Sequence, residues 1–300
     1  MKQLASLLIL AAFYLPAKAQ DTIVTVMDSA KVKEKKELSD NDAEKFPWHA
    51  RRFRIMAGTF FPINNTNVRV AGNNGNVATD IDLEDDLGFK DNTTSFYANA
   101  MWRASKRSRF ELEYFNLNRE TTKTLEKDIT FKDHTYSAFA TVDAHFNTTI
   151  ARFAYGYAIL CKPKYEVGFL VGTHLMFIDL GMGLDTSVGG VSVNDKFEVT
   201  APLPDLGIWS EVVITKRLGL YVNANYLSAK VDNIKGKILS YNVSLLYNVY
   251  QNFSLTAGYS GLDIDIDIMR PKLNGSLEWG YNGPSIAATY SFGGHINFSK

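Results

Sequence analysis

Nine ionisable residues stand in segments where large apolar side chains occupy the intervening positions. They are Arg52, Arg54, Glu111, Glu113, Arg152, Glu166, His174, Asp205 and Glu211. Basic and acidic side chains that share one face of several strands can have three roles. Buried opposite charges pair and order the structure, hydrated charges line a selective channel, and a carboxylate beside a histidine moves protons in catalysis. We expect the paired network, which closes the interior, with a charged pore as the second interpretation.

Catalysis would need a base in a recognisable spacing with its partners. His134, His145 and His174 could each serve as a base, but none has such a spacing with a serine or an acid pair. The sequence also lacks a phosphate-binding glycine loop, a metal-spaced Cys/His cluster and a nucleophile elbow. We therefore predict a non-enzymatic protein with no catalytic residue and no cofactor.

Two acidic segments raise the question of metal binding. The Asp263-Ile-Asp-Ile-Asp267 segment places three carboxylates on one face of a strand end, and Asp80 to Asp86 adds further acidic residues in a long polar segment. Neither has the glycine and the distal glutamate of a calcium-binding loop. We predict a solvated acidic rim and no metal site, although divalent cations could gather there.

The elements that must position these side chains are shown best by Leu239–Tyr259. Leu239, Tyr241, Val243, Leu245 and Tyr247 alternate with residues that are mostly small and uncharged, and the alternation resumes at Phe253. A soluble sheet usually carries long charged side chains opposite its apolar face. Short polar side chains fit inside a narrow closed barrel, so the aromatic face is predicted to lie in lipid. The fold class is therefore an all-β, closed antiparallel transmembrane β-barrel.

About ten strands are predicted, with eight or twelve as alternatives. Their expected ranges are Arg52–Phe61, Ser95–Arg103, a strand from Arg109, Thr148–Leu160, Tyr165–Leu180, Leu206–Ile214, Leu218–Tyr226, the two strands of Leu239–Tyr259, and a last strand after Gly275. Short turns fall at one end of the barrel and longer segments at the other, as in outer-membrane barrels. Residues 128–143 could extend a strand or form a folded loop. A β-bulge is predicted near Gly261, where the alternation changes phase.

The N-terminal segment predicts export. Residues 1–19 have a basic start, an apolar stretch and small residues before a cleavage point, which is the pattern of a signal peptide. Residues 20–50 are predicted to form a flexible periplasmic tail, and residues 51–300 the barrel. The 32 basic and 32 acidic residues give no reason to expect nucleic-acid binding. Cys161 is expected in a solvated turn, without a catalytic role.

The sequence resembles the small outer-membrane barrel proteins of Gram-negative bacteria, of the OmpA and OmpW type. The segments that carry this resemblance are Phe153–Tyr157, Ala201–Gly207, Gly275–Pro284 and the aromatic end of the last strand. The resemblance implies insertion by the barrel assembly machinery, which would read Tyr290, Phe292 and Phe298. It also implies contact with outer-membrane lipid and lipopolysaccharide, and we expect a monomer. Function does not follow from such a resemblance, because one fold hosts many activities.

The expected function is that of an integral outer-membrane protein. It would be either a narrow porin-like channel or a closed structural or surface-interaction barrel. The alternative is a hydrolase or acyltransferase that acts on lipid, peptide or sugar at the barrel rim.

Overall fold

The computed structural model describes residues 48–71, 78–184, 193–231, 233–270 and 273–298. All of them belong to one compact unit, Leu38–Lys300. The predicted signal peptide and residues 20–47 of the predicted tail lie outside the described residues.

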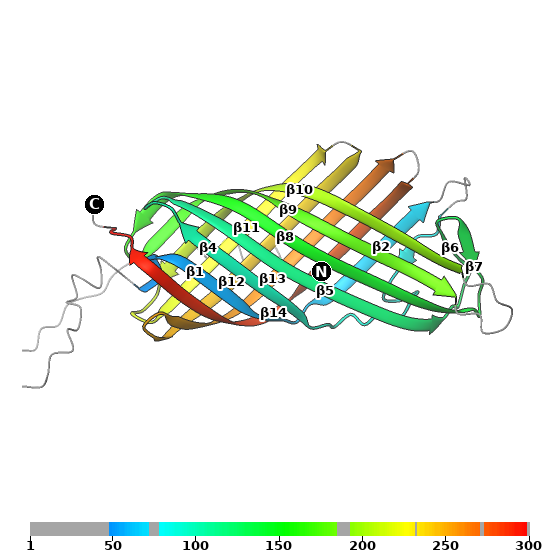
Figure 1. The fold of residues 1–300 in the computed structure, drawn as a ribbon, viewed down its shortest axis with the longest axis horizontal. Helices are drawn as coiled ribbons and strands as arrows, with labels where there is room; N and C mark the ends of the chain where they lie inside the picture. The colour runs from blue at the N-terminus through cyan, green and yellow to red at the C-terminus, as the bar shows by residue number, and fades with distance from the viewer. Residues whose placement is uncertain (1–47, 72–77, 185–192, 232, 271–272, 299–300) are drawn as a thin grey trace, which may run out of the picture. The chain divides into compact units, whose positions relative to one another are not determined.

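A closed ring of antiparallel strands forms the described structure (Figure 1). Its ten members, in ring order, are β1 (Arg51–Phe60), β4 (Ser95–Arg103), β5 (Ser108–Thr124), β8 (Thr141–Lys162), β9 (Tyr165–Leu184), β10 (Val193–Val213), β11 (Leu218–Val231), β12 (Ile234–Tyr250), β13 (Phe253–Arg270) and β14 (Leu273–His295). Pairing of β14 with β1 closes the ring. The predicted closed antiparallel barrel is confirmed.

The first strand of the barrel continues, after a break at Phe61 and Pro62, as β2 (Ile63–Ala71), and β14 pairs with both pieces. The two-residue strand β3 (Ile81–Asp82) pairs with β2. Since β4 is short, the segment after β3 fills the wall between β2 and β5. The Asn64 amide donates to the Asp91 carbonyl at 2.9 Å, and the Thr121 hydroxyl donates to the Gly88 carbonyl at 3.2 Å.

The strands run further than predicted at the end opposite the short turns. Residues 181–199 and 269–275, which lie outside the expected strands, are strand over much of their described length, because β9 ends at Leu184, β10 begins at Val193 and β13 ends at Arg270. Residues 128–143 contain both of the predicted alternatives, a folded loop and a strand extension. A hairpin of β6 (Ile129–Phe131) and β7 (His134–Tyr136) forms a folded loop, and β8 extends back to Thr141.

Strand β13 shows why the barrel has two different halves. Its outward residues change from Phe253, Leu255, Ala257 and Tyr259 to Asp263, Asp265 and Asp267, while its inward residues change from Ser254, Thr256 and Ser260 to Leu262, Ile264, Ile266 and Ile268. The pairing with β12 and β14 is continuous through Gly261. The predicted bulge is therefore wrong. The backbone keeps its alternation through Gly261, but the outward face changes from apolar to charged and the inward face from polar to apolar.

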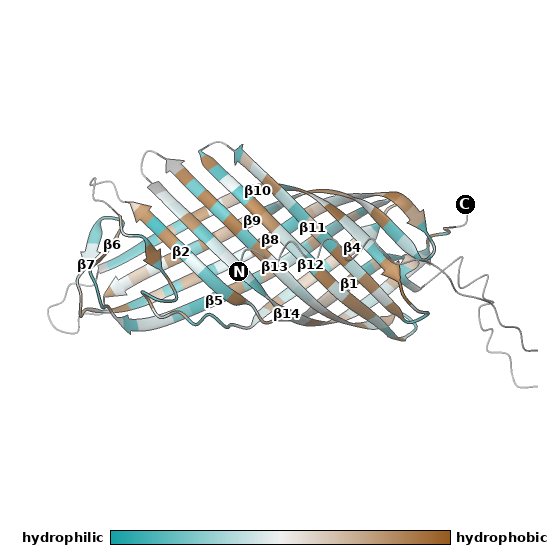
Figure 2. Cartoon of the chain, turned by 180° about the vertical axis from the view of Figure 1, so that it is seen from behind, coloured by the Kyte–Doolittle hydropathy of each residue, from teal (hydrophilic) through white to brown (hydrophobic). Residues whose placement is uncertain are grey.

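The same exchange occurs around the ring. Towards the short turns the outward side chains are large and apolar, including Ile55, Phe96, Leu112, Phe153, Phe169, Ile208, Tyr226, Val243, Leu255 and Ile286. Towards the other end they are polar or charged, including Asp143, His145, Asp179, Lys196, Glu198, Lys230, Lys235, Lys237, Asp263, Asp265, Asp267 and Glu278. Figure 2 shows the apolar belt on the half near the C-terminus and the hydrophilic surface around β2, β6 and β7.

The length of the strands explains this division. A strand of 22 residues such as β8 rises roughly 3.3 Å per residue and tilts by about 40° in a barrel, so it spans about 55 Å along the barrel axis. An outer-membrane belt is about 25 Å tall. The part beyond the belt, here called the outer end, therefore lies in polar surroundings and has the apolar-in pattern of a soluble domain. We call the opposite end, with the short turns, the periplasmic end.

No helix in the part of the chain that the structure describes has the length and hydropathy to cross a membrane.

Candidate functional site in the barrel lumen

Charged side chains from opposite walls meet inside the belt half. Arg54 lies on β1 and Glu211 on β10, which are five strands apart in either direction around the ring. The Arg54 guanidinium donates to both carboxylate oxygens of Glu211, at 2.7 and 3.3 Å. Both side chains are buried. The pair therefore bridges the interior from one wall of the barrel to the other.

Two further ion pairs join strands that are not neighbours in the ring. Arg103 of β4 bonds both oxygens of Glu166 on β9, at 2.7 and 2.9 Å. Arg152 of β8 donates to Asp205 on β10 at 2.9 Å and to Glu113 on β5 at 2.9 Å. The Arg152–Glu113 pair joins the neighbouring strands β5 and β8, and Glu113 is partly exposed. Breaking either of the two buried pairs between strands that are not neighbours would leave a buried charge without that partner in a low-dielectric interior.

Arg109 is held by both a carboxylate and aromatic rings. Its guanidinium lies 2.6 Å from Glu111 and donates to the Tyr221 hydroxyl at 3.0 Å. The guanidinium carbon is 3.3 Å from the centroid of the Trp209 ring, which is a cation–π geometry. The Trp209 ring lies against Gly168, where a Cβ atom would come 2.7 Å from the indole nitrogen. A glycine at position 168 is therefore needed to seat this ring.

Of the nine predicted interior residues, eight lie in this network: Arg54, Glu111, Glu113, Arg152, Glu166, His174, Asp205 and Glu211. Arg52 does not. It lies at the periplasmic end, half-buried, and donates to the Ala104 carbonyl at 3.1 Å. Sequence reasoning missed Arg103 and Arg109 as members, although each shares its alternation phase with inward residues of its own strand.

Both ends of the described chain fold into the periplasmic end of the lumen. The short 3-10 helix η2 (Trp48–Ala50), which falls in the predicted flexible tail, folds into the barrel with His49 and Ala50 buried. The Ile296 amide donates to the Ala50 carbonyl at 2.9 Å, and the Phe298 ring stacks on His49. These residues form the periplasmic plug.

The periplasmic plug overturns one prediction about the last strand. The sequence groups Phe298 with Tyr290 and Phe292 as the aromatic end of this strand. The strand ends at His295, Gly293 has a φ of +83°, and Ile296 and Phe298 turn inward and are buried. Tyr290 and Phe292 do face outward. A positive φ favours glycine, so Gly293 permits the change of direction.

Cys161 also differs from the prediction. It is buried on β8 and not in a solvated turn, and its thiol donates to the Lys106 carbonyl at 3.1 Å. The register of β8 shifts between Ala158 and Leu160, so Ile159 and Leu160 both face outward and Cys161 turns inward.

Burial lowers the pKa of His49 from 6.5 to about 4, because the charged imidazole would lose its hydration, while Glu211 opposes the shift and Arg103 and Arg54 add to it. The folded pKa is below the unfolded value, so protons favour the unfolded chain between these pH values. We expect stability to fall by on the order of 3 kcal/mol from this residue as pH drops from 6.5 to about 4. Urea unfolding in detergent at both pH values measures this loss.

The His49→Leu variant isolates that contribution, because it keeps an apolar side chain in the plug and removes the titration. Its unfolding free energy should change less with pH than that of the wild type. Equal pH dependence in the two proteins would show that His49 is hydrated and not part of a plug.

At the outer end an apolar core fills the barrel. It includes Phe60, Phe115, Phe146, Met176, Ile178, Phe197, Leu203, Ile264, Ile266 and Trp279. Phe146 of β8 and Trp279 of β14 meet across the interior with ring centroids 5.5 Å apart. The β6–β7 hairpin covers this core: Tyr136 donates to the Met182 carbonyl at 2.8 Å, and the Lys132 amide donates to the Val70 carbonyl at 2.9 Å. We call this core and its hairpin the outer plug.

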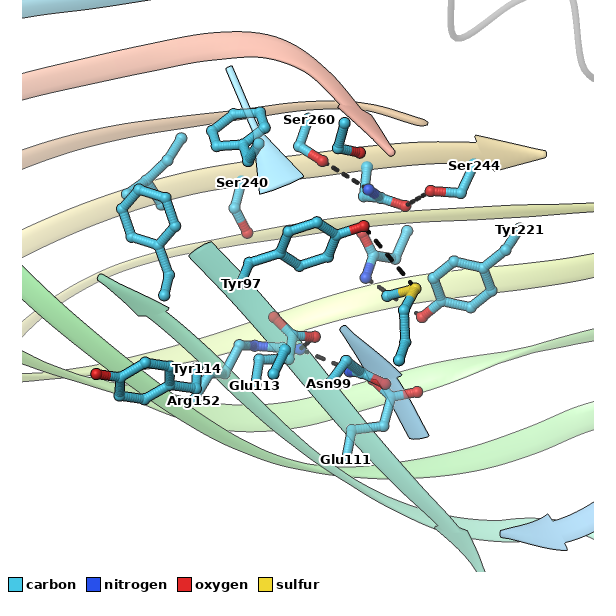
Figure 3. Close-up of a pocket in the computed structure, with 18 of the residues that line it drawn as sticks. Tyr97, Asn99, Glu111, Glu113, Tyr114, Arg152, Tyr221, Ser240, Ser244 and Ser260 are labelled. Carbon is cyan, nitrogen blue, oxygen red and sulfur yellow. Dashed lines mark hydrogen bonds and ion pairs between the residues drawn. The ribbon is translucent and has the colours of Figure 1, made fainter. Parts of the chain in front are cut away.

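Between the two plugs lies a cavity of about 180 Å³. Glu111, Glu113 and Arg152 gather on one side of it, and Ser240, Ser244 and Ser260 lie on the other (Figure 3). The Tyr97 ring extends into the cavity from β4, with its hydroxyl 3.9 Å from the Met56 sulfur.

The histidines considered as bases are each paired with a carboxylate. His134 Nδ1 lies 2.8 Å from Asp195, His145 Nε2 lies 3.2 Å from Asp179, and His174 Nδ1 lies 3.0 Å from Asp205. The three pairs are at different places: His134 on the outer hairpin, His145 on the outward face of β8, and His174 in the lumen. Among the described residues, no group of three or more His, Cys, Asp and Glu side chains is arranged to hold a metal ion.

A closed ring with an outward apolar belt and an enclosed polar layer is the architecture of an outer-membrane β-barrel. The sequence matches no family model and no curated protein. Solved structures with a similar fold include the outer membrane protease OmpT from Escherichia coli (TM-score 0.48, 10% identity, 80% of this chain and 97% of that chain covered). The translocator domain of the autotransporter NalP from Neisseria meningitidis is also similar (0.43, 10%, 80% and 88%), as is the P. putida toluene transporter TodX (0.32, 9%, 81% and 91%). These similarities concern the barrel fold alone.

Proposed function

We propose that this protein is a closed, non-conducting and non-enzymatic barrel of the outer membrane, whose outer end presents a rigid surface beyond the lipid. Export through a cleaved signal peptide, and residence as a monomer among outer-membrane lipid and lipopolysaccharide, belong to this proposal. The outward Tyr290 and Phe292 side chains near the end of β14 would serve the barrel assembly machinery as its recognition signal.

The contact between Arg54 and Glu211 is the observation that carries the proposal. Side chains of strands on opposite sides of the ring bond directly, at 2.7 Å. A conducting lumen would need water and room between these walls. At the outer end, the contact between the Phe146 and Trp279 rings joins opposite walls of the barrel a second time. The charge layer therefore favours a structural lock over a selective pore.

The surface role rests on the outer half of the strands. Their outward residues are charged and their inward residues form an apolar core, so this part is folded like a soluble domain. A packed core below a polar surface is rigid, which suits presentation of a fixed surface to other molecules.

Conductance in planar bilayers tests the proposal. We expect the refolded protein to insert without stepwise current, whereas a porin in the same bilayers conducts. Heat-modifiable migration on gels verifies that the silent sample is folded. Reproducible current steps from the folded wild type would overturn the closed-barrel proposal, and release of acyl chains, peptide or sugar from envelope material would overturn its non-enzymatic part.

A further inference from the structure

The surface of the periplasmic end is basic. Among the residues that the structure describes, this end consists of 48–53, 104–108, 161–165, 214–218, 248–253 and 291–298, and these segments contain no aspartate or glutamate. They do contain eight lysines and arginines, which we call the basic rim. Its members are Arg51, Arg52, Lys106, Arg107, Lys162, Lys164, Lys216 and Arg217.

The charges inside the lumen do not neutralise the basic rim. Four arginines and five carboxylates face the lumen in the belt half, so this layer adds at most one negative charge to the eight positive charges of the rim. They are Arg54, Arg103, Arg109 and Arg152, and Glu111, Glu113, Glu166, Asp205 and Glu211. Residues 20–47, which lie outside the described residues, contain seven acidic and five basic residues. The periplasmic end therefore keeps an excess of positive charge.

The arginines of the basic rim bond to neutral partners. Arg51 donates to the Gly293 carbonyl at 2.9 Å, and Arg107 donates to the Ile159 carbonyl at 2.7 Å. A backbone carbonyl orients a guanidinium but leaves its charge uncompensated. The outer end differs, because its outward lysines alternate with carboxylates, as in the pair of Lys235 and Asp267. Only the periplasmic side of the belt therefore presents a single sign of charge.

The basic rim lies directly beyond the apolar belt. Lys162 pairs with Tyr165, an outward aromatic residue of β9, and Lys216 is two residues from the exposed Ile214. A residue of a tilted strand advances about 2.5 Å along the barrel axis, so a lysine two residues further on lies roughly 5 Å beyond the belt. The headgroup region on each side of a bilayer is roughly 5–8 Å thick. The exposed rim residues are therefore at the level of the lipid phosphates.

We propose that the basic rim binds the headgroups of anionic phospholipids in the periplasmic leaflet. Lys162, Lys164, Lys216 and Arg217 are exposed and contact the phosphates, while the belt holds the acyl chains. Each Lys or Arg near an anionic membrane surface favours binding by about fivefold. A soluble anionic partner would have no need of charges at the edge of the belt, whereas a lipid phosphate is confined to that level. This inference rests on the membrane placement in the proposed function and not on closure of the lumen.

A tryptophan beside the basic rim can report which lipid contacts it. The structure describes all four tryptophans, and of these only Trp102 faces outward, with 47% of its side chain exposed. The Trp102→Phe/Tyr165→Trp variant moves this reporter next to Lys162 and Lys164, at an outward position that is aromatic in the wild type. The folded variant is reconstituted in phosphatidylcholine vesicles that contain brominated phosphatidylglycerol or brominated phosphatidylcholine at equal mole fraction, and fluorescence quenching is recorded.

We expect brominated phosphatidylglycerol to quench this reporter with a relative association constant at least about threefold above that of brominated phosphatidylcholine. The preference should weaken in about 0.5 M NaCl, because salt screens exposed charges. Added Lys162→Gln/Lys164→Gln substitutions should reduce the preference to less than about half of its value. The matched control is Lys235→Gln/Lys237→Gln, which removes the same charge from exposed lysines of the outer end and should leave the preference unchanged. Heat-modifiable migration verifies that each variant is folded.

Equal quenching by the two brominated lipids would overturn the proposal and would favour a soluble anionic partner, such as the peptide carboxylates of peptidoglycan. A preference that survives the loss of Lys162 and Lys164 would overturn it as well. Quenching by neither lipid would show that position 165 is not in contact with lipid, and the membrane placement in the proposed function would then fail too. These results separate a failure of lipid selection from a failure of membrane placement.

Discussion

Replacement of Glu211 with alanine should destabilise the barrel by about 3–5 kcal/mol. The variant leaves the Arg54 guanidinium buried between opposite walls without the carboxylate that accepts its hydrogen bonds at 2.7 and 3.3 Å. The positive charge cannot be lost by deprotonation, because arginine stays protonated in proteins. Urea unfolding of the folded barrel in detergent or lipid vesicles gives the free energy directly.

Two comparisons separate the loss of a buried partner from a general effect of charge removal. The double variant Arg54→Met/Glu211→Leu removes both charges and should recover most of the stability, since apolar residues can replace a buried pair. Asp267→Ala removes one member of an exposed pair, with Lys235 at 3.9 Å, and should cost less than about 1 kcal/mol. A small loss in Glu211→Ala would mean that water reaches Arg54, and the lumen would then be closer to a channel.

The alternation in the sequence predicts the wall of the barrel because each strand residue has a fixed side. Tyr241, Val243 and Leu245 face outward and Asn242 and Ser244 face inward, as the pattern requires. The pattern does not say what surrounds each side. Beyond Ser260 the same alternation continues with aspartates outward and isoleucines inward, and only the place of the lipid belt along the strand decides how to interpret it.

The partners inside the lumen could not be predicted from single strands. Arg54 and Glu211 are 157 residues apart, and they meet because ten strands close with β1 opposite β10. The phase of Arg103 and Arg109 did carry a signal, since each shares a face with Met101 or Glu111. The inward turn of Phe298 had no such signal, because it follows from Gly293 and from packing against His49 and Ala50 at the end of the barrel.

A change of charge on the outward face of β13 should have a large effect on stability in the belt half of the strand and a small effect in the outer half. Leu255→Arg puts a guanidinium into the apolar belt and should cost about 2–4 kcal/mol. Asp265 shares the outward phase but lies beyond the belt, opposite Lys237 in the pairing with β12. Asp265→Asn should therefore change the stability by less than about 0.5 kcal/mol.

The inward neighbour of Asp265 gives the second half of this prediction. Ile266 is fully buried in the outer plug, so Ile266→Asn removes apolar packing and buries an amide without a partner, at an expected cost of about 3–5 kcal/mol. Thr256→Ser, an inward change within the belt half, should cost less than half as much. All four free energies come from the same urea unfolding experiment. If Ile266→Asn were tolerated as well as Thr256→Ser, the outer half would contain water. The exchange of polarity along β13 would then mark the mouth of a pore. An apolar inward face on the part of the strand beyond the belt indicates a dry interior, and a tolerated Ile266→Asn would show that the interior is wet.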